Sequence, residues 1–540
     1  MLSLICALLI HLSHVSASIE DPSISPTPPM GFNNWARFEC ALNESLFTAT
    51  ADAMVSKGLL AAGYNRINID DCWFSNYRAE NGSLQWNSTL FPNGIIWLGQ
   101  YLHERGFKIG IYEDAGNMTC GGYPGSQGHE HEDAATFVSW GIDYLKLDGC
   151  NVVIQKGRTN EEQFKALYSL WHEIFSNMTS PLVFSQSAPA YFSPDFQTVQ
   201  NNTDWYTVMD WIPTTGELAR HSDDIKVYGT NGHWEPGGHW DSIMANYGFE
   251  VRLARYQKCG YYNDPDFLIV DFPDLTIEEK KSHFALWASF SAPLIISSYI
   301  PDLTQEEVAY LTNKEIIAVD QDALCLQATL VSQDGNWDVL TKDLANGDRL
   351  LTVLNRGEET SSTKISLERV GLDPDEIYTA KDLWTGSTKT VQGTISLRNI
   401  ISHATAIFRL SSSSLASTPT GMIFNTFSMK CLTGTPHSVG FSNCTGTDSQ
   451  VWQVSTSGLI SPLSAQMCLA EEDGYLSLTD CNISSQYQQW NYTISGNLIN
   501  RASGVCVTES RGTTRCGYEK DNQVFALPSG VELSDDTRII

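Results

Sequence analysis

The chain contains the heptapeptide Tyr144-Leu145-Lys146-Leu147-Asp148-Gly149-Cys150, in which apolar and polar side chains alternate up to a glycine. This pattern predicts a short buried strand that ends in a carboxylate. Lysine and aspartate are rarely buried without a partner, and at the carboxyl end of a barrel strand they lie where such folds carry out chemistry. Asp148 is therefore the leading candidate nucleophile. An isolated Lys-x-Asp is more often a simple ion pair, so this interpretation depends on the ends of the neighbouring strands.

Similar strand ends recur from residue 26 to residue 323, with amphipathic helical patterns between them, and this alternation predicts a parallel (β/α)8 TIM barrel. The eight strand ends are expected at 30–32, 67–71, 109–114, 147–148, 183–187, 218–220, 264–266 and 294–298. Helices are expected at 46–57, 95–105, 132–139, 161–176, 241–255 and 277–289. The polar carboxyl ends of the strands mark the active face of such a barrel.

The rest of the chain is predicted to be β-structure. Residues 324–410 lose the helical period and show short alternating segments, which predicts a small antiparallel β domain. Residues 411–419 form a Ser-rich linker that is flexible by composition. Between residues 420 and 527, Gln-x-aromatic motifs end at Trp452, Trp490 and Phe525. Their steps of 38 and 35 residues indicate one supersecondary unit used three times.

Composition limits the partners and the compartment. The 540 residues include 62 acidic and 33 basic side chains, and the net charge of -29 argues against nucleic acid or an anionic membrane as partner. Residues 1–17 combine an apolar core with a Val-Ser-Ala end, as a signal peptide does. No later apolar run is long enough to span a membrane, so we expect a secreted, extracellular protein.

Sequons and cysteines agree with a secretory route. Nine Asn-x-Ser/Thr sequons occur, at Asn43, Asn81, Asn87, Asn117, Asn177, Asn201, Asn443, Asn482 and Asn491. Of 13 cysteines, one lies in the signal segment, and the remaining even number favours disulfides over metal or thiol chemistry. The spacing suggests one local bridge per repeat, namely Cys431–Cys444, Cys468–Cys481 and Cys506–Cys516. Cys259 and Cys325 have no obvious partner except each other.

Acidic residues collect at several predicted strand ends: Asp70, Asp71, Asp114, Asp148, Asp223, Asp224, Asp264 and Asp266. They are accompanied neither by a Gly-rich phosphate loop nor by Cys/His metal spacing, so we expect neither a cofactor nor a metal. Carboxylates near aromatic residues suit sugar hydroxyls and an oxocarbenium-like transition state. Retaining hydrolysis needs one ionised acid as nucleophile and one protonated acid at the leaving oxygen. Lys146 next to Asp148 would favour the ionised form of the nucleophile.

Six motifs in order resemble family 27 of the glycoside hydrolases, the α-galactosidases and α-N-acetylgalactosaminidases. They are Pro29–Trp35, Asn68–Trp73, Gly110–Tyr112, Tyr144–Cys150, Asn263–Asp266 and His283–Ala288. The region 420–527 resembles the ricin-type β-trefoil lectin module. Where that family has a sugar-binding Asp, this chain has Thr433, Ala470 and Thr508, so a purely structural trefoil and a lectin both remain open.

The resemblance implies a role for individual residues. Asp148 matches the family's nucleophile, and the pattern Arg220-His221-Ser222-Asp223-Asp224-Ile225 selects Asp224 as acid/base. The other implied substrate contacts are Arg220 at a hydroxyl near the anomeric centre, Asp70 and Asp71 at O4 and O6, Lys146 and Tyr112 at further ring groups, and Phe32 stacked on the sugar. Two implied disulfides are Cys40–Cys72 and Cys120–Cys150.

The loop Ser185–Tyr191 bears on the substrate. In animal members of the family, Glu and a bulky residue at the positions of Ser187 and Ala190 accompany galactosidases, whereas Ser and Ala accompany enzymes that accept a 2-acetamido group. We therefore expect hydrolysis of terminal α-linked galactose and N-acetylgalactosamine in oligosaccharides, polysaccharides or glycoconjugates. Two alternatives remain open: a strict α-galactosidase acting on plant galacto-oligosaccharides and galactomannan, and a non-catalytic carbohydrate-binding lectin.

Overall fold

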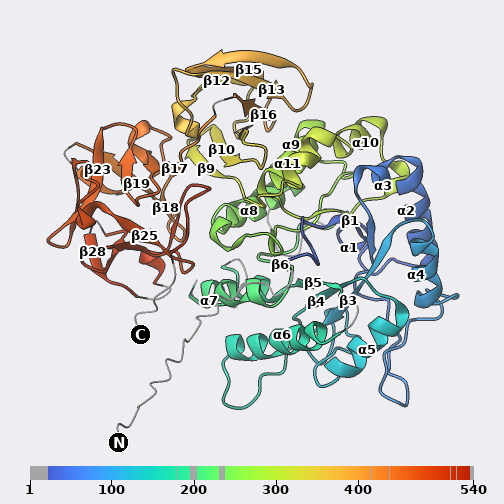
Figure 1. Ribbon diagram of the computed structural model, residues 1–540. Helices are drawn as coiled ribbons and strands as arrows, with labels where there is room; N and C mark the ends of the chain where they lie inside the picture. Colours follow the sequence, from blue (N-terminus) through green and yellow to red (C-terminus); the bar gives the residue numbers. More distant parts are fainter. Residues whose placement is uncertain are drawn as a thin grey trace, which may run out of the picture.

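The computed structural model describes residues 22–178, 181–194, 203–229, 237–413, 415–436, 438–510, 512–517 and 520–534. The predicted signal peptide, residues 1–17, and the sequon at Asn201 lie outside this part of the chain. A barrel, an antiparallel sandwich and a trefoil follow one another along the sequence and lie against one another (Figure 1).

The barrel is a parallel sheet in the order β7-β6-β5-β4-β3-β2-β1-β8. Its strands are β1 Met30–Asn33, β2 Arg66–Asn68, β3 Lys108–Asp114, β4 Tyr144–Asp148, β5 Val183–Gln186, β6 Leu218–Arg220, β7 Tyr262–Asp264 and β8 Leu294–Ile296. Leu268, just after β7, pairs in parallel with Ile296, and its N–H donates to the carbonyl of Ile295 at 2.8 Å. This pairing closes the sheet, so the predicted barrel fold is confirmed.

Helices cover the outside of the barrel. They are α1 Trp35–Phe38, α2 Glu44–Ser56, α3 Leu59–Ala62, α4 Ile95–His103, α5 Glu130–Trp140, α6 Asn160–Ser176, α7 Thr203–Trp211, α8 His239–Glu250, α9 Ile277–Phe290, α10 Gln305–Leu311 and α11 Lys314–Asp320. Capping boxes fix several starts: at α9 the Thr276 hydroxyl accepts from the Glu279 N–H at 3.2 Å, and Glu279 accepts from the Thr276 N–H at 2.7 Å. The six predicted helices are present, although α8 ends at Glu250 instead of residue 255.

The sandwich follows α11 as an antiparallel sheet in the order β12-β15-β14-β13-β16-β11-β10-β9. Its strands are β9 Thr329–Gln333, β10 Trp337–Asp343, β11 Arg349–Asn355, β12 Ser361–Ser366, β13 Ile377–Asp382, β14 Thr388–Gln392, β15 Thr394–Ile400 and β16 Thr405–Ser411. Helix α9 packs on it, with the hydroxyls of Ser289 and Thr352 2.8 Å apart. The buried ammonium of Lys342 donates to Ser291 Oγ at 2.7 Å, so the two parts share a polar interface.

The Ser-rich segment 411–419 runs along the sandwich. Ser417 Oγ donates to Asp343 at 2.7 Å, and the Thr418 N–H donates to the carbonyl of Gly371 at 2.9 Å. Composition predicts a flexible linker here, but these bonds attach its described residues to the sandwich. Serine and threonine hydroxyls bind backbone and carboxylate partners when a surface is near, which composition alone does not reveal.

The trefoil contains β17 Thr420–Met422, β18 Phe424–Asn425, β19 Cys431–Thr435, β20 Ser438–Ser442, β21 Val451–Val454, β22 Ile460–Pro462, β23 Met467–Glu472, β24 Tyr475–Asp480, β25 Trp490–Tyr492, β26 Leu498–Asn500, β27 Val505–Thr508, β28 Gly512–Arg515 and β29 Phe525–Ala526. The predicted repeat is visible in its core. Trp452 Nε1 donates to the carbonyl of Leu432 at 2.8 Å, and Trp490 Nε1 makes the same bond to Leu469 at 2.9 Å.

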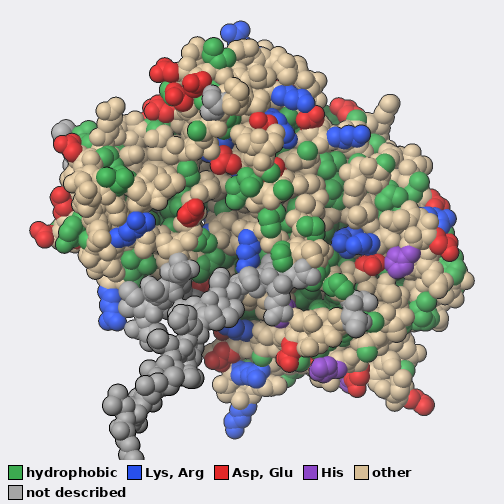
Figure 2. Space-filling view, in the orientation of Figure 1, with side chains coloured by type: hydrophobic (Ala, Val, Ile, Leu, Met, Phe, Trp, Pro, Cys, Tyr) green, Lys and Arg blue, Asp and Glu red, His purple; other side chains and the backbone are tan. Residues whose placement is uncertain are grey.

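Six disulfides link the chain: Cys40–Cys72, Cys120–Cys150, Cys259–Cys325, Cys431–Cys444, Cys468–Cys481 and Cys506–Cys516. Cys259 and Cys325 thus pair with each other. Among the described residues, every helix is too short or too polar to cross a bilayer. On the face shown in Figure 2, basic side chains are scattered among acidic ones.

Candidate active site

The carboxyl ends of the barrel strands bring the predicted site residues together. The parallel register pairs Tyr112 with Lys146 and Asp114 with Asp148 across β3 and β4, and Lys146 with Ser185 across β4 and β5. Because alternate residues of a strand point to the same face, Lys146 and Asp148 both point into the barrel. Functional side chains from strands far apart in the sequence therefore meet at one mouth.

Lys146 binds Asp70, not its neighbour Asp148. Its Nζ donates to Asp70 Oδ2 at 2.7 Å, and Asn33 Nδ2 donates to the same oxygen at 2.7 Å. The ammonium still acts electrostatically on Asp148 and Asp224, and the surrounding carboxylates raise the pKa of Lys146 against the opposing effect of burial. Lys146 therefore acts on Asp148 through space, because its direct ion pair is with Asp70.

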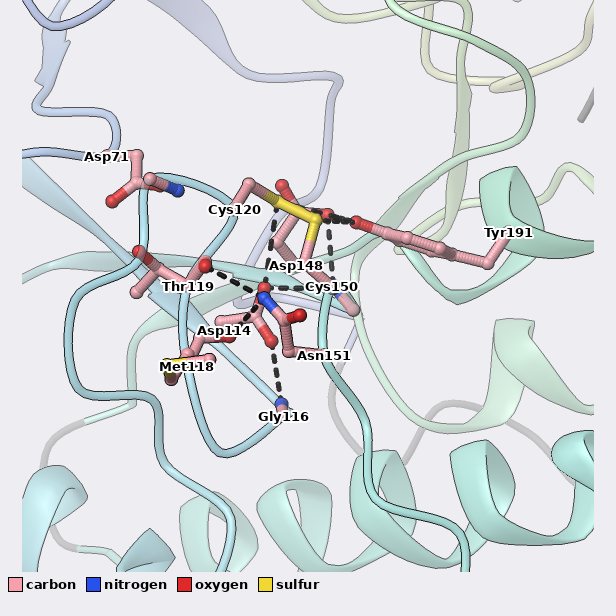
Figure 3. Close-up of a disulfide and its surroundings, with 12 residues drawn as sticks. Asp71, Asp114, Gly116, Met118, Thr119, Cys120, Asp148, Cys150, Asn151 and Tyr191 are labelled. Atoms are coloured by element: carbon pink, nitrogen blue, oxygen red, sulfur yellow. Dashed lines mark hydrogen bonds between the residues drawn. A yellow bond between two sulfur atoms is a disulfide. The ribbon is translucent and has the colours of Figure 1, made fainter.

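The carboxylate of Asp148 is held by Tyr191. The Tyr191 hydroxyl donates to Asp148 Oδ1 at 2.5 Å, and the Gly149 N–H donates to the same oxygen at 3.0 Å. Burial raises the pKa of Asp148, although Lys146 and the Tyr191 hydroxyl oppose the rise. Figure 3 shows Tyr191 reaching from its short helix toward Asp148 and the neighbouring disulfide. Tyr191 was missed as a site residue, because nothing in its local sequence shows which strand it faces.

Asp114 and a disulfide hold the turn that follows Asp148 (Figure 3). Asp114 is completely buried, and its two oxygens accept from the N–H groups of Gly116 at 2.6 Å and Cys150 at 2.9 Å. The Cys120–Cys150 disulfide lies beside both tyrosines: Tyr112 Oη is 3.4 Å from Cys120 Sγ, and Tyr191 Oη is 3.2 Å from Cys150 Sγ. This framework leaves the Asp148 side chain little freedom.

Asp71 faces the same loop. Its carboxylate accepts from the N–H groups of Gly121 at 2.7 Å and Cys72 at 2.6 Å, and burial raises the pKa of Asp71 to about 6. Cys72 has a left-handed φ of 74°, which is unusual for a residue with a side chain. Backbone strain of this kind persists where surrounding contacts fix the conformation, here the Asp71 bonds and the Cys40–Cys72 disulfide.

Asp224, in the loop after β6, is bound to Arg220. The guanidinium is 3.1 Å from Asp224 Oδ1 and 3.0 Å from Asp266 Oδ1, and it donates to the backbone carbonyls of Ser222 and Asp223. The side chain of Asp224 is 52% exposed. Partial desolvation in the barrel mouth raises its pKa, but Arg220 and Lys146 outweigh this effect and lower the pKa of Asp224 overall. Arg220 thus meets the carboxylate of Asp224 and the backbone carbonyl of Asp223.

Asp266 holds the same loop. Besides its contact with Arg220, its Oδ2 accepts from the Ile225 N–H at 2.7 Å, and its own φ is 79°. The side chain is buried. Asp266 therefore connects the loop after β7 to the loop that carries Asp224, a link that the sequence motif does not reveal.

The stacking role predicted for Phe32 is wrong. Phe32 is completely buried, and its ring meets Phe47 of α2 edge-on at 6.5 Å between centroids. The next residue, Asn33, points to Asp70 in the mouth, so Phe32 points to the outer helical layer. An aromatic residue that does reach a predicted catalytic acid is Trp35, three residues later, which is half-buried and donates from Nε1 to Asp224 Oδ2 at 3.3 Å.

Ser187 and Ala190 follow β5, the strand between β4, which ends at Asp148, and β6, which ends at Arg220. Strand β5 pairs Leu147 with Gln186 on one side and Gln186 with Ala219 on the other. One residue further, this register places Ser187 between Asp148 and Arg220. Ser187 is buried and Ala190 half-buried at the short helix Ala188–Phe192 that carries Tyr191. Gln186 itself turns outward and accepts from Thr215 Oγ1 at 2.6 Å.

The predicted glycosylation sites lie at the surface. Of the sequon asparagines within the described residues, Asn43, Asn81, Asn117, Asn177, Asn443 and Asn482 are exposed, and Asn87 and Asn491 are half-buried. All of them are therefore accessible to some degree.

Three family models match successive parts of the chain. Residues 27–322 match "Alpha galactosidase A", residues 334–410 match "Alpha galactosidase C-terminal beta sandwich domain", and residues 419–525 match "Ricin-type beta-trefoil lectin domain". The probable alpha-galactosidase A of Aspergillus flavus is 58% identical over 522 residues, 96% of each chain. The alpha-galactosidase A of Aspergillus niger is 57% identical over 527 residues, 96% of this chain and 95% of that one.

Solved structures resemble the first two parts. Alpha-galactosidase I from Mortierella vinacea superposes with a TM-score of 0.65 at 27% identity, covering 74% of this chain and 100% of that chain. The alpha-galactosidase from Saccharomyces cerevisiae with raffinose gives a TM-score of 0.62 at 25% identity, over 72% of this chain and 98% of that chain. These two proteins correspond to less than the full length of this chain, whereas the Aspergillus relatives match nearly all of it.

Proposed function

This chain belongs to the alpha-galactosidase A family, and on that premise we propose that it is a secreted, retaining exo-glycosidase. Its substrates are terminal α-linked galactose and, through an open 2-position pocket, α-linked N-acetylgalactosamine. The names of the Aspergillus relatives and the raffinose bound to the yeast relative support the galactoside part. The observation that carries the proposal is the pair of acids at one mouth, Asp148 held by Tyr191 and Asp224 held by Arg220.

Asp148 and Asp224 have different roles in the reaction. Asp148, oriented by Tyr191 and Gly149, attacks the anomeric carbon while Asp224 donates a proton to the leaving oxygen. Asp224 then removes a proton from water, which hydrolyses the glycosyl ester and frees Asp148. The half-exposed position of Asp224 suits a group that meets both the aglycone and water. No step requires a cofactor.

The 2-position is where the finer specificity arises. C2 is bonded to the anomeric carbon, so its substituent lies beside Asp148, and Arg220 supplies donors on the same side. We assign Ser187 and Ala190, which follow β5 between the strands that carry Asp148 and Arg220, to this position, because their small side chains suit an acetamido group. Asp70, held by Lys146 and Asn33, and Asp71 remain for the hydroxyls on the far side of the ring.

The catalytic assignment is tested with Asp148→Asn and Asp224→Asn in the full-length protein. Each variant keeps the side-chain volume, so we expect native thermal unfolding with turnover of p-nitrophenyl α-galactoside reduced by about 10³-fold or more. Asp223→Asn is the matched control, and it should retain most of the activity. Normal turnover by either test variant would remove the residue concerned from the mechanism. Galactoside binding without hydrolysis by the unmodified protein would favour the lectin alternative.

Substrate choice is tested by comparing kcat/KM for p-nitrophenyl α-galactoside and α-N-acetylgalactosaminide. The unmodified enzyme should hydrolyse both. Ser187→Glu combined with Ala190→Leu fills the proposed pocket, so it should lower kcat/KM for the acetamido sugar by at least about tenfold, or 1.4 kcal/mol, more than for galactose. A native enzyme that already prefers galactose by more than about tenfold would support the strict α-galactosidase alternative.

Export is proposed from the amino-terminal segment, six disulfides and surface sequons together. Mass spectrometry of the protein collected from culture medium should show a chain that starts after Ala17 and carries N-glycans. Retention inside the cell with an intact amino terminus would contradict this part.

A further inference from the structure

We propose that the trefoil supports the loop that carries Asp224, acting through helix α7, and so contributes to turnover of substrates that it never touches. The inference rests on the proposed role of Asp224 as acid/base. Figure 1 shows the trefoil beside α7 and the sandwich. The buried cluster of the barrel continues into the trefoil without interruption and includes Phe424, Val524 and Ala526.

The first polar link joins α7 directly to the trefoil. Tyr206 of α7 is 1% exposed, and its Oη lies 2.5 Å from the hydroxyl oxygen of Thr426. Thr426 is completely buried, and its hydroxyl donates to the carbonyl of Val524 at 3.3 Å. With that proton engaged, the threonine oxygen accepts from Tyr206, and the pair forms a hydrogen-bonded link across an otherwise apolar contact.

The second link runs through a buried arginine. Arg255 Nε donates to the trefoil carbonyl of Ile494 at 2.8 Å, and one terminal nitrogen donates to Tyr256 Oη at 2.7 Å. The Tyr256 hydroxyl donates in turn to Asp210 of α7 at 2.9 Å. A Cβ on Gly496 of the trefoil, whose φ is 79°, would lie 3.2 Å from the guanidinium carbon of Arg255. The same Cβ would lie 2.8 Å from Val524 Cγ1, so the trefoil backbone packs closely at this point.

Helix α7 carries this support to the acid/base loop. Tyr206 and Asp210 are four residues apart and share the face toward the trefoil. Trp205 is completely buried, packs edge-on against Phe249 at 5.6 Å between centroids, and donates from Nε1 to the carbonyl of His221 at 3.0 Å. His221 directly follows Arg220 and begins the loop that ends at Asp224. Displacement of α7 would therefore alter the distance between Asp224 and a bound glycoside.

The trefoil's own candidate sugar positions are occupied by internal contacts, which favours a structural role. Ala470 and Thr508 are buried, and Thr433 Oγ1 accepts from Gln450 Nε2 at 3.0 Å. The Thr508 hydroxyl oxygen lies 2.9 Å from that of Ser510. Two of the three positions thus make contacts within their own repeat, and Ala470 and Thr508 are shielded from solvent.

The test uses the full-length enzyme and p-nitrophenyl α-galactoside, a substrate too small to need a lectin. Tyr206→Phe and Thr426→Val each remove one side of the first link, and Arg255→Met removes the second. Tyr475→Phe and Arg515→Met are the matched controls on exposed trefoil positions. We expect each link variant to lower kcat roughly three- to tenfold with KM within about twofold, because a misplaced acid slows the chemical step and leaves sugar binding intact. The controls should match the unmodified enzyme.

Hydrogen exchange gives a readout that does not depend on activity. Peptides that cover α7 and residues 218–229 should exchange faster in Thr426→Val, whose change lies wholly in the trefoil, and peptides from α2 and α4 should not. Unchanged kcat and unchanged exchange at 218–229 in correctly folded link variants would overturn the inference. An unmodified enzyme that fails to hydrolyse either sugar would instead overturn the proposed function, and the exchange result would still decide whether the trefoil supports the loop.

Discussion

At the scale of single residues, the two proposed catalytic acids are biased against their working protonation states before substrate arrives. Burial raises the pKa of Asp148, which must be ionised to attack, and Arg220 with Lys146 lowers the pKa of Asp224, which must be protonated to act as acid. The two groups also repel each other when both are ionised, so their titrations belong to the pair. A bound sugar that draws the Arg220 donors to its hydroxyls reverses part of this bias.

The consequence is a difference between two pH profiles. The kcat/KM profile reports the free enzyme, in which Arg220 lowers the pKa of Asp224, so its basic limb falls at low pH. The kcat profile reports the complex, in which we expect the sugar to weaken that contact and to exclude water, and both changes would raise the pKa of Asp224. We expect the basic limb of kcat to lie at higher pH than that of kcat/KM. Coinciding limbs, measured on p-nitrophenyl α-galactoside, would show that substrate does not disturb the Arg220–Asp224 contact.

Tyr191 controls the acid limb of the kcat/KM profile. Its hydroxyl donates to Asp148 and stabilises the ionised form, so Tyr191→Phe raises the pKa of Asp148 and moves the acid limb of kcat/KM to higher pH. Loss of one hydrogen bond to a charged group should lower kcat about tenfold. Tyr168→Phe is the matched control, because that hydroxyl donates to the backbone carbonyls of Leu147 and Asp148. A shift of the acid limb in the control as large as in Tyr191→Phe would indicate a general disturbance of the strand.

At the scale of elements, β3 and α5 are joined to the loop after β2 by a buried charge cluster. Arg78 donates to both oxygens of Asp133, at 2.6 and 2.7 Å, and Asp133 is completely buried. Glu113 lies close by, and burial raises the pKa of both acids. Removal of the guanidinium would leave two buried carboxylates without their cation.

Arg78→Met should therefore destabilise the protein by about 3–5 kcal/mol at neutral pH. This loss of stability should be smaller at low pH. Without the guanidinium, the pKa values of Glu113 and Asp133 rise further, so both acids become protonated in the folded state as the pH falls. Arg105→Met, which removes an exposed ion pair with Asp52, is the control and should cost about 0–1 kcal/mol. Urea unfolding at pH 4 and pH 7 measures the difference. An equal loss of unfolding free energy at both pH values would mean that protonation of Asp133 and Glu113 does not affect stability.

The elements differ in how far the sequence predicts them. The eight strand ends follow from alternating hydrophobicity interrupted by glycine and acidic residues, and the pattern of Tyr144–Asp148 matches β4. Helix α7 was missed, because Thr, Tyr, Trp and Val dominate it and these residues have low intrinsic helix propensity. Its contacts on two sides stabilise it, through Trp205 to the barrel and Tyr206 to the trefoil. Contacts between residues so distant in sequence leave no local periodicity.

The same distinction applies to the site. The position of Asp148 at the end of a barrel strand could be predicted from local alternation, and motif spacing selected Asp224, which meets Arg220 in the structure. Their catalytic roles stay a prediction. The direction of the Phe32 side chain could not be predicted, because neighbouring residues of a strand point to opposite faces. Only the bond from Asn33 to Asp70 shows that Asn33, not Phe32, points inward. The partner of Lys146 was equally hidden: Asp70 is 76 residues away in sequence and lies on a different strand loop.

At the scale of the whole molecule, the number of sugar sites distinguishes an enzyme with a structural trefoil from an enzyme with a lectin. The barrel mouth offers one site, and in the trefoil Thr433, Ala470 and Thr508 replace the acids that would bind a sugar, with Ala470 and Thr508 buried. Titration calorimetry of the full-length protein with galactose, the reaction product, should therefore give one site per chain. Asp70→Ala removes a carboxylate from the barrel mouth and should abolish the heat signal. Two or more sites per chain, or a signal that persists in Asp70→Ala, would place a sugar on the trefoil and restore to it a binding role in addition to its contacts with α7.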